Sequence, residues 1–160
     1  MTLKSGGVIL APMEPLEPLA DPKTKRVLIV DDDSNIRSLL EMGAQREGFV
    51  TATAEDGAEA AKAIQEFHPD IIITDLMMPQ QGGFELIRGL QGTDHGAVPI
   101  IIITARRLDE STKEMLRREG SVVQVLTKPL SLNIFAITLH RLLKTQPPAS
   151  ERSRGLNDRF

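Results

Sequence analysis

Short runs of apolar and β-branched residues alternate along this chain with longer segments in which apolar positions recur at helical spacing. A short apolar run bounded by acidic residues, Pro or Gly is typical of a strand buried on both faces of a parallel sheet. Apolar positions three and four residues apart are typical of a helix with one buried face. The pattern predicts strands over 25–30, 49–54, 70–75, 99–104 and 122–127, and helices over 34–47, 58–67, 84–90, 107–119 and 132–144.

Strands that alternate with helices imply βαβ units, and therefore a parallel sheet with helices on both faces. Right-handed crossovers leave few topologies for such a chain. We predict an α/β fold with a doubly wound, five-stranded sheet of order 2-1-3-4-5, the flavodoxin-like arrangement. Ligands of such sheets bind beyond the carboxyl ends of the strands, so the residues that follow each strand are the first candidates for chemistry.

The regular pattern occupies only the middle of the chain. Residues 1–24 carry a proline at nearly every third or fourth position in their second half, which excludes a helix, so we predict an extended or disordered arm. Residues 145–160 are polar, with a weak excess of positive charge, and are predicted to form a flexible tail. The sequence thus predicts one domain over 25–144 between two flanking segments.

Composition removes several classes of function. The chain has no cysteine, which excludes disulfides and thiolate metal sites. Its net charge is −3 and its aromatic content is 3%, all Phe, so neither a phosphate-binding surface nor a base-stacking platform is expected. No apolar run approaches the roughly 20 residues of a membrane-spanning helix. We expect a cytoplasmic protein that binds neither nucleic acid nor membrane.

Carboxylates follow two of the predicted strands. Asp31 and Asp32 come directly after the first strand, and Asp75 ends the third. In the predicted strand order these two strands are neighbours, so the three carboxylates meet at one edge of the sheet. Like charges in close quarters raise one another's pKa, and a divalent cation relieves the repulsion. Oxygen ligands alone favour Mg²⁺, with Mn²⁺ as the second choice.

Two further side chains are predicted to reach the same edge. Thr104 ends the fourth strand and Lys128 follows the fifth. A lysine ammonium suits phosphate oxygens as a compact charge, and a hydroxyl can donate to such an oxygen. A carboxylate nucleophile, a metal ion, a lysine and a hydroxyl together indicate phosphoryl transfer onto Asp75, with an acyl phosphate as the product.

This combination resembles the receiver domain of bacterial two-component response regulators, and the resemblance covers about residues 25–144. The matching positions are Val30–Asp33 after the first strand, Asp75–Pro79 with Gly83 and Glu85 after the third, Thr104–Ala105 after the fourth, and Lys128–Pro129 after the fifth.

The resemblance implies a stand-alone switch rather than an enzyme, one that catalyses only its own phosphorylation and dephosphorylation. Asp75 would accept a phosphoryl group from a histidine of a sensor histidine kinase or a phosphotransfer protein. Mg²⁺ would be bound directly by Asp32, by Asp75 and by the backbone carbonyl of Met77, and through water by Asp31. The output would be binding to a downstream protein, by a monomer or weak dimer.

The resemblance also assigns roles to the fourth and fifth strands. Thr104 would move to bond the phosphoryl group, and Lys128 would bridge to it, with a cis peptide at Lys128–Pro129. The sequence departs from the family at Val125, where receiver domains usually have Tyr or Phe, and over 120–124, which replaces the usual Gly-Ala-Asp-Asp approach. Because Val has few rotamers and no hydroxyl, the resemblance does not extend to the usual relay from Thr104 through an aromatic residue.

Other functions share part of this chemistry. A phosphate sink or phosphorelay intermediate would differ only in its partners, and a pseudo-receiver adaptor would work without phosphorylation. A phosphatase of the haloacid dehalogenase type also uses an Asp at a strand end with Mg²⁺, but it wants a second Asp where this chain has Met77. His68, His95 and His140 lie on separate predicted elements with no evident acidic partner, and we predict no ligand or phosphorelay role for them.

Overall fold

The computed structural model describes residues 16–79, 81–105 and 107–149. Five parallel strands form one sheet in the order β2-β1-β3-β4-β5, which confirms the predicted topology. Their bounds are β1 (Arg26–Val30), β2 (Val50–Ala54), β3 (Ile71–Asp75), β4 (Ile100–Thr104) and β5 (Val122–Thr127). Each strand was predicted to within one residue at each end.

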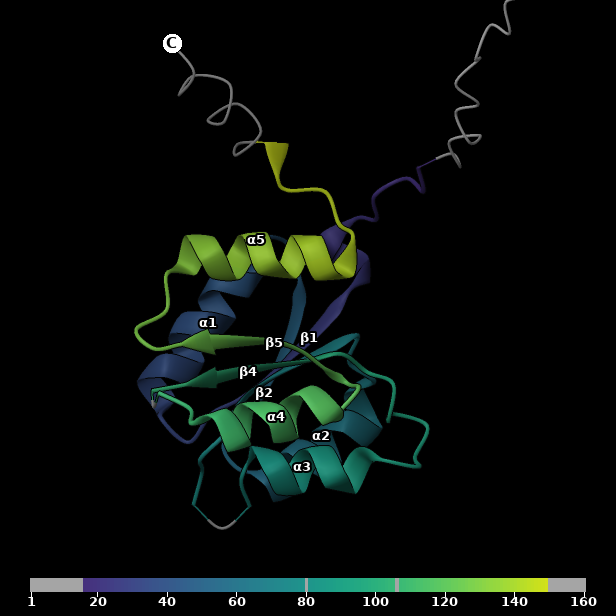
Figure 1. Ribbon diagram of the computed structural model, residues 1–160. Helices are drawn as coiled ribbons and strands as arrows, with labels where there is room; N and C mark the ends of the chain where they lie inside the picture. Colours follow the sequence, from purple (N-terminus) through teal and green to yellow (C-terminus); the bar gives the residue numbers. More distant parts are fainter. Residues whose placement is uncertain (1–15, 80, 106, 150–160) are drawn as a thin grey trace, which may run out of the picture.

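Helices cover both faces of the sheet (Figure 1). Helices α1 (Ser34–Arg46) and α5 (Leu132–Leu143) lie on one face. Helices α2 (Gly57–Phe67), α3 (Gly83–Leu90) and α4 (Glu110–Arg118) lie on the other. The fold is therefore the three-layer arrangement predicted from the alternation of strands and helices.

Apolar residues of each central strand point alternately to the two faces. Val27 and Ile29 of β1 belong to the core under α1 and α5, whereas Leu28 and Val30 belong to the core under α2, α3 and α4. Every residue of β3 and β4 is buried. Burial on both faces is why these strands read as continuous apolar runs in the sequence.

Local sequence signals set the ends of α1 and the start of α4, and the latter differs from the predicted start. Asp33 caps α1 by accepting from the backbone N–H groups of Asn35 and Ile36, and Gly48 after the helix has a φ of +97°, which a glycine adopts without strain. The fourth helix was predicted to begin at residue 107 but begins at Glu110. The reason is that Asp109 accepts from the backbone N–H of Thr112 and so fixes the helix start there.

The two flanking segments are more ordered next to the domain than the sequence predicted. Pro22–Thr24 forms a short 3-10 helix capped by Asp21, where proline at the first position is tolerated. Ala20 pairs with Thr145: the Ala20 N–H donates to the Lys144 carbonyl at 2.9 Å, and the Gln146 N–H donates to the Ala20 carbonyl at 3.0 Å. Folded structure thus extends beyond the predicted 25–144, because these backbone groups pair with each other.

The remainder of the predicted arm and tail, residues 1–15 and 150–160, lies outside the described residues. Within the part of the chain that the structure describes, none of the helices has the length and apolar character needed to cross a membrane.

Candidate functional site

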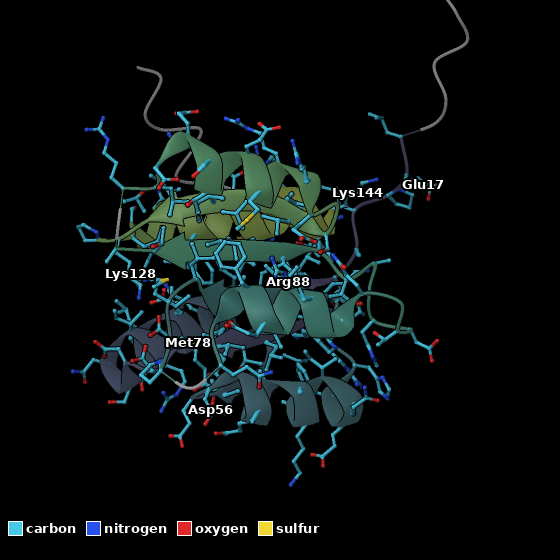
Figure 2. All side chains as sticks on the ribbon, turned by 60° about the horizontal axis from the view of Figure 1, so that its bottom comes forward. Glu17, Asp56, Met78, Arg88, Lys128 and Lys144 are labelled. Atoms are coloured by element: carbon cyan, nitrogen blue, oxygen red, sulfur yellow. The ribbon has the colours of Figure 1, made fainter. Side chains whose placement is uncertain are left out.

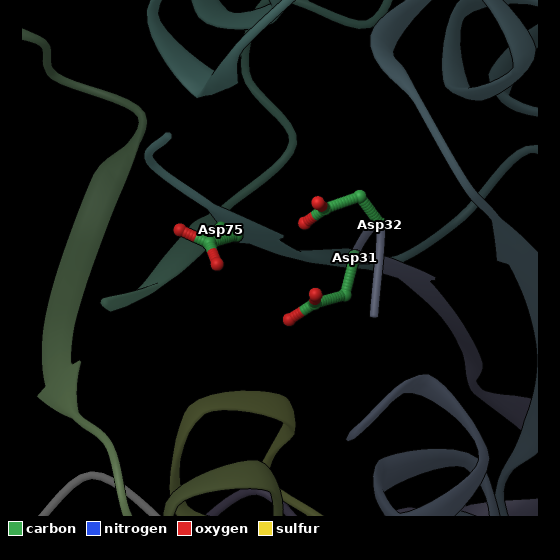
Figure 3. Close-up of side chains that lie close together, drawn as sticks. All are labelled: Asp31, Asp32 and Asp75. Atoms are coloured by element: carbon green, nitrogen blue, oxygen red, sulfur yellow. The ribbon is translucent and has the colours of Figure 1, made fainter. Parts of the chain in front are cut away.

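The carboxylates of Asp31, Asp32 and Asp75 meet at the carboxyl edge of the sheet. Strands β1 and β3 pair in a register that sets Val30 against Thr74, so the residues that follow them lie at the same level. One oxygen of each of the three carboxylates lies within 4.8 Å of the others. Figure 3 shows Asp31 and Asp32 reaching from the end of β1 toward Asp75. The structure therefore assembles the acidic cluster that the strand order predicted.

Lys128 joins this cluster from the end of β5. Its Nζ lies 2.7 Å from Oδ2 of Asp75 and 2.9 Å from Oδ2 of Asp31. The Lys128 backbone N–H donates to the carbonyl of Thr104 at 2.9 Å, which holds the turn after β5 against the end of β4. The peptide bond between Lys128 and Pro129 is cis, as predicted. One ammonium group thus bridges two carboxylates of different strands.

Burial and hydrogen bonding change the pKa values of Asp31 and Lys128. Burial raises the pKa of the Asp31 carboxyl above its ordinary value, and it outweighs the hydrogen bonds from Lys128 and from the Asp33 backbone, which act in the opposite direction. Burial also acts to lower the pKa of Lys128, but the hydrogen bonds to Asp75 and Asp31 and their charges outweigh it, so this pKa lies above its ordinary value. Lys128 therefore remains a cation beside the carboxylates.

The loop after β3 holds the Asp75 side chain and leaves no room for bulk beside it. The backbone N–H of Met77 donates to Oδ1 of Asp75 at 3.0 Å. A Cβ added to Gly83 would lie 2.7 Å from the carbonyl oxygen of Asp75, closer than real Cβ atoms approach. Gly83 is thus required by the close approach of α3 to the end of β3.

The donor set of the cluster fits a hard divalent cation. All the candidate ligand atoms are oxygens, which is the set that Mg²⁺ and Mn²⁺ take in proteins. A second acidic group, formed by Glu55, Asp56 and Glu59, has a structural explanation. The Glu59 N–H donates to the capping residue Asp56, and the Glu55 N–H, just before the cap, donates to the Glu59 side chain. These hydrogen bonds at the start of α2 account for the group.

The other predicted site residues take different positions. Thr104 is buried at the end of β4, directly beside the cluster in the strand order. Met77 is 57% exposed, and its backbone N–H contacts Asp75. Val125 is 37% exposed on β5 and lines an open groove of about 800 Å³ between α4 and β5, which Thr104 also lines.

The histidines have partners that the sequence did not reveal. His140 was expected to have no acidic partner, but its Nε2 lies 2.9 Å from Oε2 of Glu47, and its Nδ1 lies 2.7 Å from Oγ1 of Thr145, with all three residues buried. His68 and His95, expected to be scattered, lie with ring nitrogens 3.3 Å apart. None of these contacts reaches Asp75. Glu47 lies far from His140 in the sequence, as His68 does from His95, so no local pattern could have revealed these two pairs.

Comparison with known proteins decides the family. Residues 27–139 match the model of the response regulator receiver domain. The chain belongs to the response regulator receiver family.

Relatives of this receiver domain include longer regulators. The alkaline phosphatase synthesis transcriptional regulatory protein PhoP of Bacillus subtilis is 32% identical over 134 residues, which cover 84% of this chain and 55% of PhoP. The transcriptional regulatory protein PrrA of Mycobacterium tuberculosis is 36% identical over 119 residues, which cover 74% of this chain and 50% of PrrA. The chain spans about half the length of these curated relatives.

Solved structures match the receiver domain along almost their whole length. The chemotaxis protein CheY4 of Vibrio cholerae superposes with a TM-score of 0.69 at 31% identity, covering 74% of this chain and 98% of CheY4. The receiver domain of the Francisella response regulator 1452 gives a TM-score of 0.65 at 31% identity, covering 75% and 97%. Residues 27–139 are therefore a receiver domain, the signalling domain of two-component response regulators.

Proposed function

We propose that this receiver domain is a phosphorylation switch in which Asp75 is the phosphoacceptor. An oxygen of Asp75 attacks the phosphorus of a phosphohistidine on a partner kinase or phosphotransfer protein. The P–N bond breaks, the histidine nitrogen leaves with the electron pair, and an acyl phosphate forms on Asp75. The observation that carries this proposal is the position of Lys128 Nζ, within 2.9 Å of both Asp75 and Asp31 at the acidic edge.

Each residue of the edge has a role in this reaction. Asp32, Asp75 and the Met77 carbonyl would hold Mg²⁺, with Asp31 acting through water, and the ion would neutralise charge on the incoming phosphoryl group. Lys128 already pairs with Asp75 and would keep contact with the phosphoryl oxygens after transfer.

Thr104 supports the proposal from the neighbouring strand. Its hydroxyl, at the end of β4, would donate to a phosphoryl oxygen, so Thr104 would move when Asp75 is phosphorylated. The aromatic residue to which such a change is usually passed in this family is replaced by Val125. We propose that the phosphorylated domain signals by binding a downstream protein. We expect the conformation at Val125 to change little when Asp75 is phosphorylated.

A phosphodonor experiment tests the proposal. The full chain is treated with Mg²⁺ and a small acyl phosphate, or with beryllofluoride, and amide NMR spectra are recorded for the wild type and for Asp75→Asn. We expect shifts around Asp75 and Thr104 that require both Mg²⁺ and the phosphodonor and that Asp75→Asn abolishes. Phosphodonor-dependent shifts that persist in Asp75→Asn would show that another residue is the acceptor, and no such shifts in the wild type would refute the switch.

A further inference from the structure

Asp31 forms hydrogen bonds through its backbone N–H, its carbonyl and its carboxylate. Its N–H donates to the carbonyl of Ala54 at 3.2 Å, and its carboxylate accepts from the Asp33 N–H and from Lys128, both at 2.9 Å. Its carbonyl oxygen accepts from Nη1 of Arg37 at 2.7 Å. Arg37 lies outside the acidic edge, and its side chain donates this last hydrogen bond.

Arg37 reaches this carbonyl from a well-anchored place. It lies at the start of α1, where its own N–H donates to the carbonyl of the capping residue Asp33 at 2.9 Å. Further along the helix, Leu40 and Ala44 are buried in the core beneath α1 and α5. The helix therefore fixes the base of the Arg37 side chain, and the half-buried guanidinium reaches back over the turn that joins β1 to α1.

The carbonyl that Arg37 holds belongs to the peptide unit joining Asp31 to Asp32. The plane of this peptide sets the direction in which the Asp32 side chain leaves the backbone. Asp32 is exposed, in contrast to the buried Asp31, so packing around its side chain does little to orient it. Figure 3 shows the Asp32 carboxylate turned toward Asp75, the geometry that a shared cation needs.

We propose that Arg37 is a positioning residue for the Mg²⁺ site: by holding the Asp31 carbonyl, it aims the Asp32 carboxylate at the cation. This inference rests on the proposed function, in which Asp32 is a direct ligand. Residues that orient ligands from outside the ligand set typically change metal affinity by about 10- to 100-fold when removed.

A simple charge effect predicts the opposite sign. The guanidinium is a positive charge beside a cation site, so its removal would strengthen Mg²⁺ binding if repulsion were its main contribution. Positioning predicts weaker binding instead. The sign of the change in Mg²⁺ affinity therefore separates the two effects, and it needs no phosphodonor.

The test is a Mg²⁺ titration of the full chain, followed by amide NMR, for the wild type, Arg37→Ala and Arg37→Lys. We expect the Mg²⁺ dissociation constant to rise about tenfold in Arg37→Ala, with an intermediate value in Arg37→Lys, which keeps the charge and one donor. Arg46→Ala, an exposed position on the same helix, is the matched control and is expected to bind like the wild type. Thermal melting of the metal-free variants verifies that each is folded.

Phosphorylation by a small acyl phosphate adds a second readout. We expect saturating Mg²⁺ to restore the rate of Arg37→Ala, because the nucleophile and Lys128 remain in place. If folded Arg37→Ala binds Mg²⁺ as tightly as the wild type or more tightly, the inference is wrong. If Arg37→Ala does not fold, the inference is wrong when Arg37→Lys has both the Mg²⁺ affinity of the wild type and the wild-type spectrum at Asp32. A wild type that binds no Mg²⁺ overturns the proposed function itself.

Discussion

At the scale of single residues, the buried carboxylate of Asp31 lowers the stability of the metal-free fold. Asp31 is 1% exposed, and burial raises its pKa above the ordinary value of 3.8. A carboxyl whose pKa is higher in the folded than in the unfolded chain costs stability wherever both states are ionised. That cost is present at neutral pH, and it disappears as the pH falls through the folded pKa to below 3.8.

We therefore predict that Asp31→Asn raises the melting temperature of the metal-free protein at pH 7. The gain should shrink as the pH is lowered and vanish below the ordinary Asp pKa, because the wild-type carboxyl is then protonated in both states. Lys128 keeps its bond to Asp75 in this variant. Melting curves in chelator across this pH range measure the effect, and a gain that is independent of pH would contradict it.

Gly83 offers a second prediction at this scale. Gly83→Ala should lower the free energy of unfolding by about 1–3 kcal/mol and weaken phosphorylation, because the new methyl meets the Asp75 carbonyl. Gly89→Ala is the matched control in the same helix, since nothing lies within 4 Å of its added Cβ. That control should gain about 0.5–1 kcal/mol from helix propensity. Urea unfolding measures the free energy of unfolding of both variants, and equal values for the two would contradict the prediction.

At the scale of elements, a buried polar contact ties together segments remote from the acidic edge. Glu47 at the end of α1, His140 of α5 and Thr145 after α5 form one hydrogen-bonded chain, next to the pairing of Ala20 with Thr145. Figure 2 shows Lys144 and Glu17 at one end of the molecule, with Lys128 and Met78 at the other. The flanking segments therefore meet the domain far from Asp75.

We predict that Glu47→Ala lowers the free energy of unfolding by about 2 kcal/mol, because it leaves a buried imidazole nitrogen without its partner. Hydrogen exchange at the amides of Ala20, Thr145 and Gln146 should accelerate, since their pairing rests on this contact. Glu66→Ala on the exposed side of α2 is the control and should change neither quantity. Unchanged exchange in Glu47→Ala would show that the flanks dock without this contact.

At the scale of the whole molecule, a ligand that binds only the folded state stabilises all of it. Mg²⁺ at 100 times its dissociation constant should add about 2.7 kcal/mol to the free energy of unfolding, and chelator should reverse this. The Asp32→Asn variant should lose most of the gain, because it lacks a proposed ligand. Equal Mg²⁺ stabilisation of the wild type and Asp32→Asn would place the ion elsewhere.

The replacement at Val125 leads to a prediction about how the signal spreads. On activation with beryllofluoride, amide shifts around Thr104 should exceed those around Val125, because a β-branched side chain has few rotamers to exchange. NMR spectra of the activated and resting protein measure both regions at once. A rearrangement centred on β5 and α4 would contradict the expectation.

The sequence by itself determined the elements, their order and the acidic edge. Buried strands such as Ile71–Asp75 and Ile100–Thr104 are continuous apolar runs, and parallel pairing brings their carboxyl ends to one edge, so Asp31, Asp75 and Lys128 could be placed together in advance. These inferences succeed because they depend on local periodicity and on a topology with few alternatives.

Only the tertiary structure decided the contacts between segments distant in the chain. The pairs Glu47 with His140 and Ala20 with Thr145 have no local signature, because each depends on how a helix end or a flank packs against the finished domain. The bond from Arg37 to the Asp31 carbonyl is closer in sequence, but it too depends on the angle at which α1 leaves the sheet. Side-chain reach across packed elements is set by three-dimensional geometry, which hydrophobic patterning does not encode.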